Sequence, residues 1–205
     1  QLNRRNAARG RKEVQPIYTQ ADAIASLQSF RAVEYERWTD VIPGVRARYW
    51  NAGHLLGSAS IELEITEQGA ARPLRVLLSE AKLLQPDPEA PADLDYVIAE
   101  ATYGDRVRGA TTPALRRQHL AAEVRDAAAA GGALLIPAFA VERTQELIVD
   151  LVALMEERAI PTAPIFLDSP LAIRATEVFR RHAASLDPTV DAARLLNSPH
   201  LKFTE

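Results

Sequence analysis

Two stretches of this sequence alternate apolar and polar residues, and this pattern constrains the fold more than any other feature. Apolar side chains take every second position in residues 45–49 and again in residues 61–65, and charged residues fill the positions between them. Successive strand residues point to opposite faces of a sheet, so both stretches are predicted to be half-buried strands. The connection 51–58 contains Gly53 and Gly57 and is typical of a turn.

Shorter apolar runs extend this strand-rich part of the chain. Residues 74–78 and 96–99 are short enough to be buried strands, and the proline-rich connection 85–91 separates them. Before them, residues 20–30 predict a short helix. The apolar face of that helix would carry Ala23, Ile24 and Leu27. The first half of the chain is therefore expected to be mainly sheet.

The second half alternates helices with strands. A helix is predicted over residues 113–130, and Gly131 and Gly132 end it. A strand over residues 133–136 then leads into a helix whose apolar residues recur at helical spacing. These apolar residues are Ile148, Leu151, Val152 and Met155.

A second strand and helix follow. Residues 165–167 predict a strand, and Ser169 and Pro170 open a helix as its N-cap and first-turn proline. Helices that alternate with strands in this way favour a parallel, Rossmann-like sheet. The fold class is therefore predicted to be α/β.

Composition and charge limit the kinds of protein this chain can be. The 205 residues are 47% hydrophobic and 25% charged, which is a globular rather than a disordered composition. The net charge of −3 gives no overall attraction for nucleic acid, so RNA affinity requires a local basic patch. The basic run in residues 1–12 is one such patch, although a solvated helix or tail is the commoner explanation of a charge run.

Cysteine is absent, which excludes disulfides and thiolate ligands and leaves His, Asp and Glu as the strong metal ligands. No apolar run approaches the roughly 20 residues that a bilayer span requires, and no signal-peptide pattern opens the sequence. We therefore expect a soluble, cytoplasmic protein with no membrane partner. The sequence runs from Gln1 to Glu205 without the marks of natural termini, so we also expect a fragment.

His54 is the first candidate for chemistry. It lies between Gly53 and Gly57, just beyond a predicted strand, where the backbone can turn sharply and present an imidazole at the sheet edge. Such a group can bind a metal ion, but it can equally be a hydrogen-bonded structural residue. Hydrolytic zinc sites need at least three protein ligands, so His54 requires partners.

Four segments resemble motifs of the β-CASP nucleases of the metallo-β-lactamase fold, and they occur in the family's order. Residues 51–59 (NAGHLLGSA) resemble the third metal motif, which the family commonly writes Asp-Ala-Gly-His. Residues 100–106 (EATYGDR) resemble the first β-CASP motif. Residues 136–147 (IPAFAVERTQEL) and 166–172 (FLDSPLA) resemble two further signatures of the β-CASP domain.

The resemblance implies a fold, an activity and a cofactor. It predicts a partial metallo-β-lactamase-like αββα core in residues 1–111 and a partial, Rossmann-like β-CASP domain in residues 112–205. It implies a metal-dependent phosphodiesterase that acts on RNA, usually with two zinc ions in a cleft between the domains. By match to motif, His54 would be a metal ligand and Glu100 a catalytic acid near the cleft.

The sequence also departs from the family pattern. The His-x-His-x-Asp-His string that supplies most of the zinc ligands is absent. Residues 78–83 (LSEAKL) stand where the family usually has Ser-Gly-Asp, and Glu80 would have to replace the bridging aspartate. The closing histidine motifs are absent too. The remaining histidines, His119, His182 and His200, do not match them.

The other site residues have structural alternatives. Glu100 can cap the turn that follows its strand, and Asp105 can pair with Arg106. Arg143 can contact a phosphate or form a domain-interface ion pair. Ser169 is a helix N-cap, and the same helix end attracts a phosphate, although Asp168 opposes an anion there.

Two hypotheses follow. The chain is either an incomplete piece of an active zinc-dependent ribonuclease, or a catalytically inactive β-CASP module that binds RNA or a partner. In the second case it would form a homo- or hetero-oligomer with another β-CASP subunit.

Overall fold

The computed structural model describes residues 2–12, 14–79, 91–102, 104–105 and 112–204. The chain divides into two compact units, Gln1–Glu34 and Tyr35–Glu205, which are described separately. Among the described helices, none is long and apolar enough to cross a membrane.

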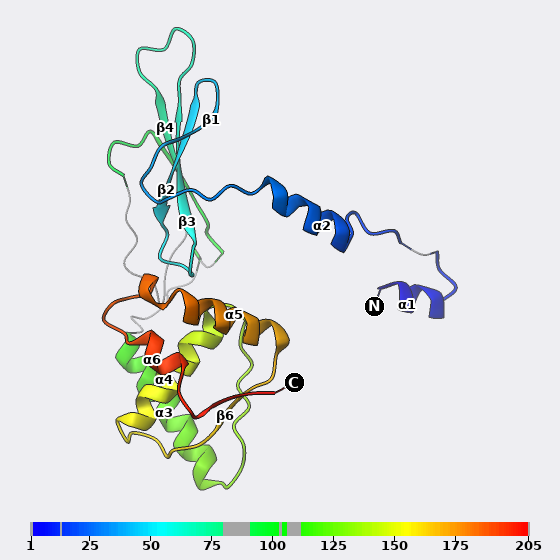
Figure 1. Ribbon diagram of the computed structural model, residues 1–205, viewed down its shortest axis with the longest axis vertical. Coiled ribbons are helices and arrows are strands. Elements are labelled where there is room, and N and C mark those ends of the chain that lie inside the picture. The colour runs from blue at the N-terminus through cyan, green and yellow to red at the C-terminus, as the bar shows by residue number, and fades with distance from the viewer. Residues whose placement is uncertain (1, 13, 80–90, 103, 106–111, 205) are drawn as a thin grey trace. The chain divides into compact units, whose positions relative to one another are not determined.

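The first unit contains two short helices, α1 (Leu2–Ala8) and α2 (Gln20–Ser26), drawn in blue in Figure 1. A capping box opens α2, because Thr19 Oγ1 accepts from the backbone of Asp22 and the Asp22 carboxylate accepts from the backbone of Thr19. A 3₁₀ turn, η1 (Leu27–Ser29), continues the predicted helix. Its apolar side chains do not pack, since Ile24 and Leu27 are exposed.

A five-stranded sheet begins the second unit. Its strands are β1 (Thr39–Ile42), β2 (Val45–Asn51), β3 (Ala59–Ile65), β4 (Leu74–Ser79) and β5 (Tyr96–Ala99), in that spatial order. The first three pairings are antiparallel, and β5 runs parallel to β4. The four strands predicted from the sequence are thus confirmed. The alternating pattern gave no sign of β1.

The two faces of this sheet differ in chemistry. The alternation of β2 and β3 places apolar residues on one face and charged residues on the other. The charged face holds the most buried polar group of the sheet, because the Glu62 side chain is 0% exposed. Its carboxylate accepts hydrogen bonds from Arg48 Nε (2.9 Å), Trp50 Nε1 (2.8 Å) and Arg75 Nε (2.9 Å).

Tryptophan rings lie against two arginines of this charged face, Arg46 and Arg48. The guanidinium of Arg46 lies 4.4 Å from the centroid of the Trp38 ring, and that of Arg48 lies 4.5 Å from the same centroid. Arg48 is also 4.6 Å from the Trp50 ring. Cation–π attraction is strongest at tryptophan, so these rings hold the charged face together.

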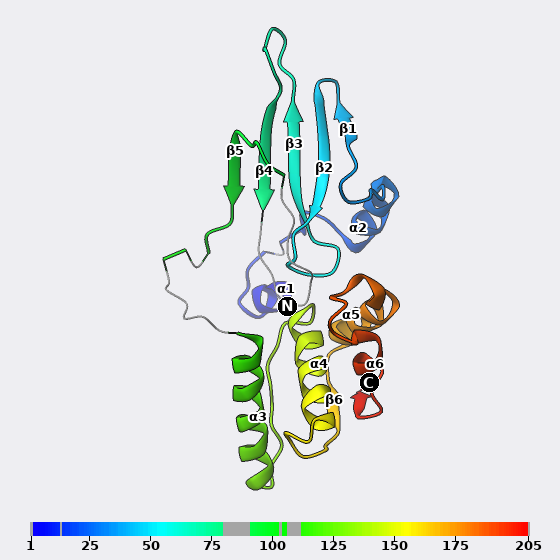
Figure 2. The ribbon, with the colours of Figure 1, turned by 90° about the vertical axis from the view of Figure 1, so that its left-hand side faces the viewer.

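The two edges of the sheet also differ. β1 carries the exposed carboxylate of Asp40, and its register shifts between Asp40 and Ile42. β5 is uncharged throughout, and all four of its residues are exposed. Figure 2 shows β1 and β5 at opposite sides of the sheet.

The remainder of the second unit is helical. Its elements are α3 (Pro113–Ala129), α4 (Arg143–Glu156), β6 (Ile165–Leu167), α5 (Pro170–Arg181), η2 (Ala183–Ser185), α6 (Ala192–Leu196) and β7 (Leu201–Phe203). β6 and β7 form a parallel pair. Together with the first sheet they make the chain an α/β protein, as the sequence predicted, and its strand pairs are both antiparallel and parallel.

One apolar cluster forms the core of this helical part. Leu56, from the turn after β2, packs against the same cluster. The buried members of the cluster are Ala121, Ile148, Val149, Val152, Leu154, Met155, Ile160, Phe179, Leu186, Ala192, Leu195, Leu196 and Leu201.

The strand predicted over residues 133–136 was wrong. No strand forms there, and Leu135 is 90% exposed. A strand needs a neighbour to complete its hydrogen-bond ladder, and β6 pairs with β7 instead. The apolar run alone did not identify a partner. In the part of the chain that the structure describes, the parallel sheet of the helical half is therefore limited to β6 and β7.

Candidate functional site

The turn that carries His54 joins the paired ends of β2 and β3, where Asn51 lies opposite Ala59. Gly53 and Gly57 have φ angles of 64° and 81°, which favour glycine because a Cβ would be strained there. Asn51 Oδ1 accepts from the Gly53 backbone at 2.9 Å. Both glycines of the predicted turn are thus used to reverse the chain.

Ser58 fixes the rest of the turn. Its Oγ accepts from the backbone N–H groups of His54 (3.2 Å) and Leu55 (3.0 Å). Its carbonyl accepts from the Tyr35 hydroxyl at 3.0 Å. Burial raises the pKa of Tyr35, so this phenol remains a donor at neutral pH. The backbone on both sides of His54 is therefore held in place, and its side chain is partly buried.

The described residues do not complete a metal site around His54. Among them, no group of three or more His, Cys, Asp or Glu side chains is placed to hold a metal ion. A hydrolytic zinc ion needs three protein ligands and an open position, so the ligands found here do not fit that ion by themselves. Glu80, the predicted replacement for the bridging aspartate, lies outside the described residues.

Glu100 follows β5 and lies at the same end of the sheet as the His54 turn. Because β3 is antiparallel to both β2 and β4, and β5 is parallel to β4, the C-terminal ends of β2, β4 and β5 all lie at that end of the sheet (Figure 2). Three strand spacings separate β2 from β5, which is roughly 14 Å. The fold thus brings the His54 turn and Glu100 to the same end of the sheet.

The carboxylate of Glu100 caps the turn after β5. Its Oε2 accepts from the backbone N–H of Thr102 at 2.9 Å, and the side chain is exposed. This is the structural alternative considered for an acid at a strand end. The ion pair expected between Asp105 and Arg106 involves a residue outside the described ranges.

Arg143 is the first residue of α4 and lies within residues 136–147, which resemble a β-CASP motif. Its Nη1 is 2.8 Å from Glu146 Oε2, and its side chain is 46% exposed. The preceding Glu142 has φ 66° and ψ −64°, and the N–H of Arg143 bonds to the carbonyl of Val141. That is a γ-turn of the rare kind, which is strained for any residue but glycine.

Gln145 holds this turn against α5. It is 0% exposed, and its Nε2 donates to the Ala140 carbonyl (3.1 Å) and to Thr176 Oγ1 (2.9 Å). Thr176 in turn donates to the carbonyl of Ala172. Sequence analysis did not identify Gln145, because its partner Thr176 lies 31 residues away.

A buried acid pair on α4 was also missed. Burial raises the pKa of Glu146 and of Asp150, although nearby arginines oppose the rise in both. Arg116 of α3 donates to Asp150 Oδ2 from Nε at 3.0 Å, and its Nη1 is 3.5 Å from Glu146 Oε1. These contacts join α3 to α4. Only the spacing of acids along the buried side of α4 could have signalled them.

Ser169 begins α5 as predicted. Its Oγ accepts from the Ala172 backbone at 3.3 Å, which is the N-cap bond. Asp168 Oδ1 accepts from Thr204 Oγ1 at 3.0 Å, so the ends of β6 and β7 are tied together. Both residues of this predicted phosphate site therefore have structural partners.

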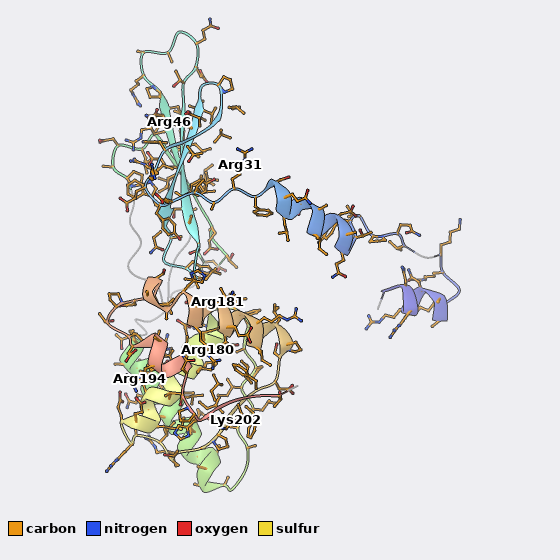
Figure 3. All side chains as sticks on the ribbon, in the orientation of Figure 1. Arg31, Arg46, Arg180, Arg181, Arg194 and Lys202 are labelled. Carbon is orange, nitrogen blue, oxygen red and sulfur yellow. The ribbon has the colours of Figure 1, made fainter. Side chains whose placement is uncertain are left out.

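Four basic side chains near the C-terminal end of the chain, labelled in Figure 3, differ in their contacts and exposure. Arg180 donates twice to the Leu196 carbonyl, at 2.9 and 2.8 Å, and lies over the Phe203 ring. Arg194 pairs with Glu156 and Asp191. Arg181 and Lys202 are exposed.

Comparisons with known proteins identify the class. Residues 144–205 match the sequence model of the Beta-Casp domain. The chain is 34% identical over 170 residues to "Ribonuclease TTHA0252" of Thermus thermophilus, covering 82% of this chain and 37% of that protein. It is 32% identical over 159 residues to "Transcription termination factor FttA" of Methanosarcina mazei, covering 76% of this chain and 24% of the relative.

A eukaryotic relative gives the same result. "Cleavage and polyadenylation specificity factor 73" of Drosophila melanogaster is 27% identical over 186 residues, covering 90% of this chain and 27% of that protein. The chain belongs to the β-CASP family of the metallo-β-lactamase fold. Membership implies a metal cofactor. The chain spans well under half the length of the relatives it matches.

Proposed function

We propose that this chain is part of a metal-dependent RNA phosphodiester hydrolase, in which the His54 turn presents one ligand to a zinc ion. The observation that carries the proposal is the match to a protein named a ribonuclease over 82% of the chain. A stretch of that length in 205 residues necessarily includes His54, Glu100 and Arg143. The alignment therefore includes the segments that resemble the family at 51–59, 100–106 and 136–147.

The geometry of the turn supports a ligand role for His54. Metal ligands need a fixed direction, and the backbone here is held by Ser58, Asn51 and Tyr35. Because the described residues do not complete a three-ligand site, the remaining ligands of this proposal lie outside them.

Glu100 is the proposed acid beside the metal. It is exposed at the edge where β2, β4 and β5 end, so it can face a bound substrate. Its hydrogen bond from the Thr102 backbone fixes the direction of the carboxylate.

RNA contacts are proposed for Arg143 and Ser169, each at the start of a helix in the β-CASP half. Arg143 is half exposed beyond its bond to Glu146, and the N-terminus of α5 follows Ser169. Arg181 and Lys202 add exposed positive charge on α5 and β7. With a net charge of −3, binding depends on such local cations. Pairing with a second β-CASP subunit is part of the same proposal.

A hairpin exchange tests the ligand role. In "Ribonuclease TTHA0252", the homologous hairpin is replaced by residues 45–65 of this chain, and cleavage of 5′-labelled single-stranded RNA is measured. The chimera is expected to cleave and to contain zinc by elemental analysis. The His54→Ala version is expected to lose cleavage to background and to lose bound metal.

The control is Arg46→Gln, at the far end of the same hairpin, which is expected to leave cleavage unchanged. Cleavage that survives His54→Ala would refute the ligand role. A folded chimera that binds RNA and retains no metal with intact His54 would favour an inactive RNA-binding module instead.

A further inference from the structure

The His54 turn, residues 51–58, is held by hydrogen bonds at its base and by side-chain packing at its tip. At the base, Ser58 and Asn51 bond the turn to itself, and Tyr35 ties it to the segment before β1. At the tip, Leu56 packs against the apolar cluster of α3–α6. The candidate ligand lies between these two anchors.

Two adjacent leucines of this turn differ in what they touch. Leu55 and Leu56 are both partly buried, but only Leu56 belongs to the side chains packed against the helical core. Leu55 contributes its backbone to the turn, since its N–H bonds to Ser58 Oγ and its carbonyl accepts from the Ser58 N–H. The neighbouring leucine is thus a matched control within the same turn.

The glycines make the tip contact important. Gly53 and Gly57 flank the segment, and glycine backbone is the most permissive in φ and ψ. Hydrogen bonds at the base restrict the backbone near Ser58, whereas the direction of the tip depends on side-chain packing.

We propose that Leu56 is a positioning residue that locks the His54 turn to the helical half of the chain. Packing of α3–α6 thereby adds to the hydrogen bonds at the base in fixing the direction of the His54 imidazole. This inference rests on the proposed function only in assigning the His54 imidazole as a metal ligand. The lock itself is a property of the metal-free chain.

Hydrogen exchange measures the lock directly. The whole 205-residue chain is compared with Leu56→Ser, Leu55→Ser and Leu56→Met by exchange mass spectrometry, without metal or RNA. In Leu56→Ser, the peptide covering 51–58 is expected to exchange about tenfold faster, as the loss of a partly buried leucine's packing implies. Leu55→Ser is expected to change that rate much less, and Leu56→Met to restore it.

Two further readouts keep the test decisive. The NMR resonances of the His54 imidazole are expected to shift in Leu56→Ser and to return in Leu56→Met. Exchange across α4 (residues 143–156) reports whether the helical half has stayed folded; if it has not, Leu56→Ala replaces the serine variant. Unchanged exchange of 51–58, or an equal effect of Leu55→Ser, overturns the lock. Loss of zinc binding in the hairpin chimera with an intact lock overturns only the proposed function.

Discussion

Arg75 lies opposite Glu64 on the neighbouring strand, yet its Nε donates to Glu62, the diagonal residue on the same face. Its Nη2 bonds to the same oxygen. Arg48, which does lie directly opposite Glu62, donates to the other carboxylate oxygen. Burial raises the pKa of Glu62, but the bonds from Arg75, Trp50 and Arg48 together outweigh it and leave the pKa below its ordinary value. Glu62 is therefore the ionised centre of the charged face.

Neutralising Glu62 should strongly destabilise the sheet. Glu62→Gln keeps the shape but leaves Arg48 and Arg75 without a balancing charge, which costs about 3–5 kcal/mol for a buried pair. Urea unfolding followed by tryptophan fluorescence measures this loss, since both tryptophans lie at this face. Glu64→Gln is the control and should cost much less, because its partner Arg46 is substantially exposed. Equal losses for the two variants would contradict this account.

Asp95 should make stability depend on acid pH. Its carboxylate accepts from Arg72 Nη1 and from the Arg75 backbone, both at 2.9 Å, and these bonds lower its pKa from 3.8 to about 2. A lowered folded-state pKa gives stability that is present above pH 4 and lost as the pH falls toward 2. In Asp95→Asn, the decline of the unfolding midpoint between pH 4 and pH 2 should be shallower. Parallel declines in both proteins would exclude this contribution.

Gln145 should be a stability residue of the β-CASP half. Gln145→Leu removes the bonds that Nε2 donates to the partly buried Ala140 carbonyl and to the buried Thr176 hydroxyl, and such a loss costs about 1–3 kcal/mol. Thermal unfolding measures the loss. Glu177→Gln, on the exposed side of α5, is the control and should have no measurable effect. A neutral result for Gln145→Leu would show that the bonds to Ala140 and Thr176 add nothing.

The 205-residue chain alone should show no metal-dependent cleavage of single-stranded RNA. His54 cannot assemble a hydrolytic zinc site unaided, and no three-ligand group occurs among the described residues. Incubation with zinc, dialysis and elemental analysis should give less than one ion per chain. Turnover that disappears in His54→Ala would overturn this expectation.

Local pattern predicted most elements of the fold. Alternation identified β2 and β3, helical spacing of apolar residues identified α2, α3 and α4, and the N-cap Ser169 with Pro170 placed the start of α5. The three-residue strand β7 and the five-residue helix α6 were not predicted, because so short a segment carries little periodicity. The wrong strand at 133–136 has the opposite cause: an apolar run indicates burial but does not supply a partner strand.

The candidate site was predicted in its parts but not in its contacts. Sequence reasoning identified the glycine turn around His54 and the N-cap at Ser169. It could not predict that Asp168 meets Thr204, 36 residues later, or that Leu56 reaches the helical core. Such contacts depend on how elements pack, and no local pattern records them. The domain boundary predicted at residues 111 and 112 stays a prediction.

The two edge strands of the sheet differ in how readily they could pair with a further strand. A further strand would meet a charge and a register shift at β1, whereas β5 offers four uncharged, exposed residues. Joining at β5 would lengthen the sheet two strands away from the hairpin that carries His54. Among the described strands, β5 is therefore the edge at which a further strand could add hydrogen bonds without displacing the His54 hairpin.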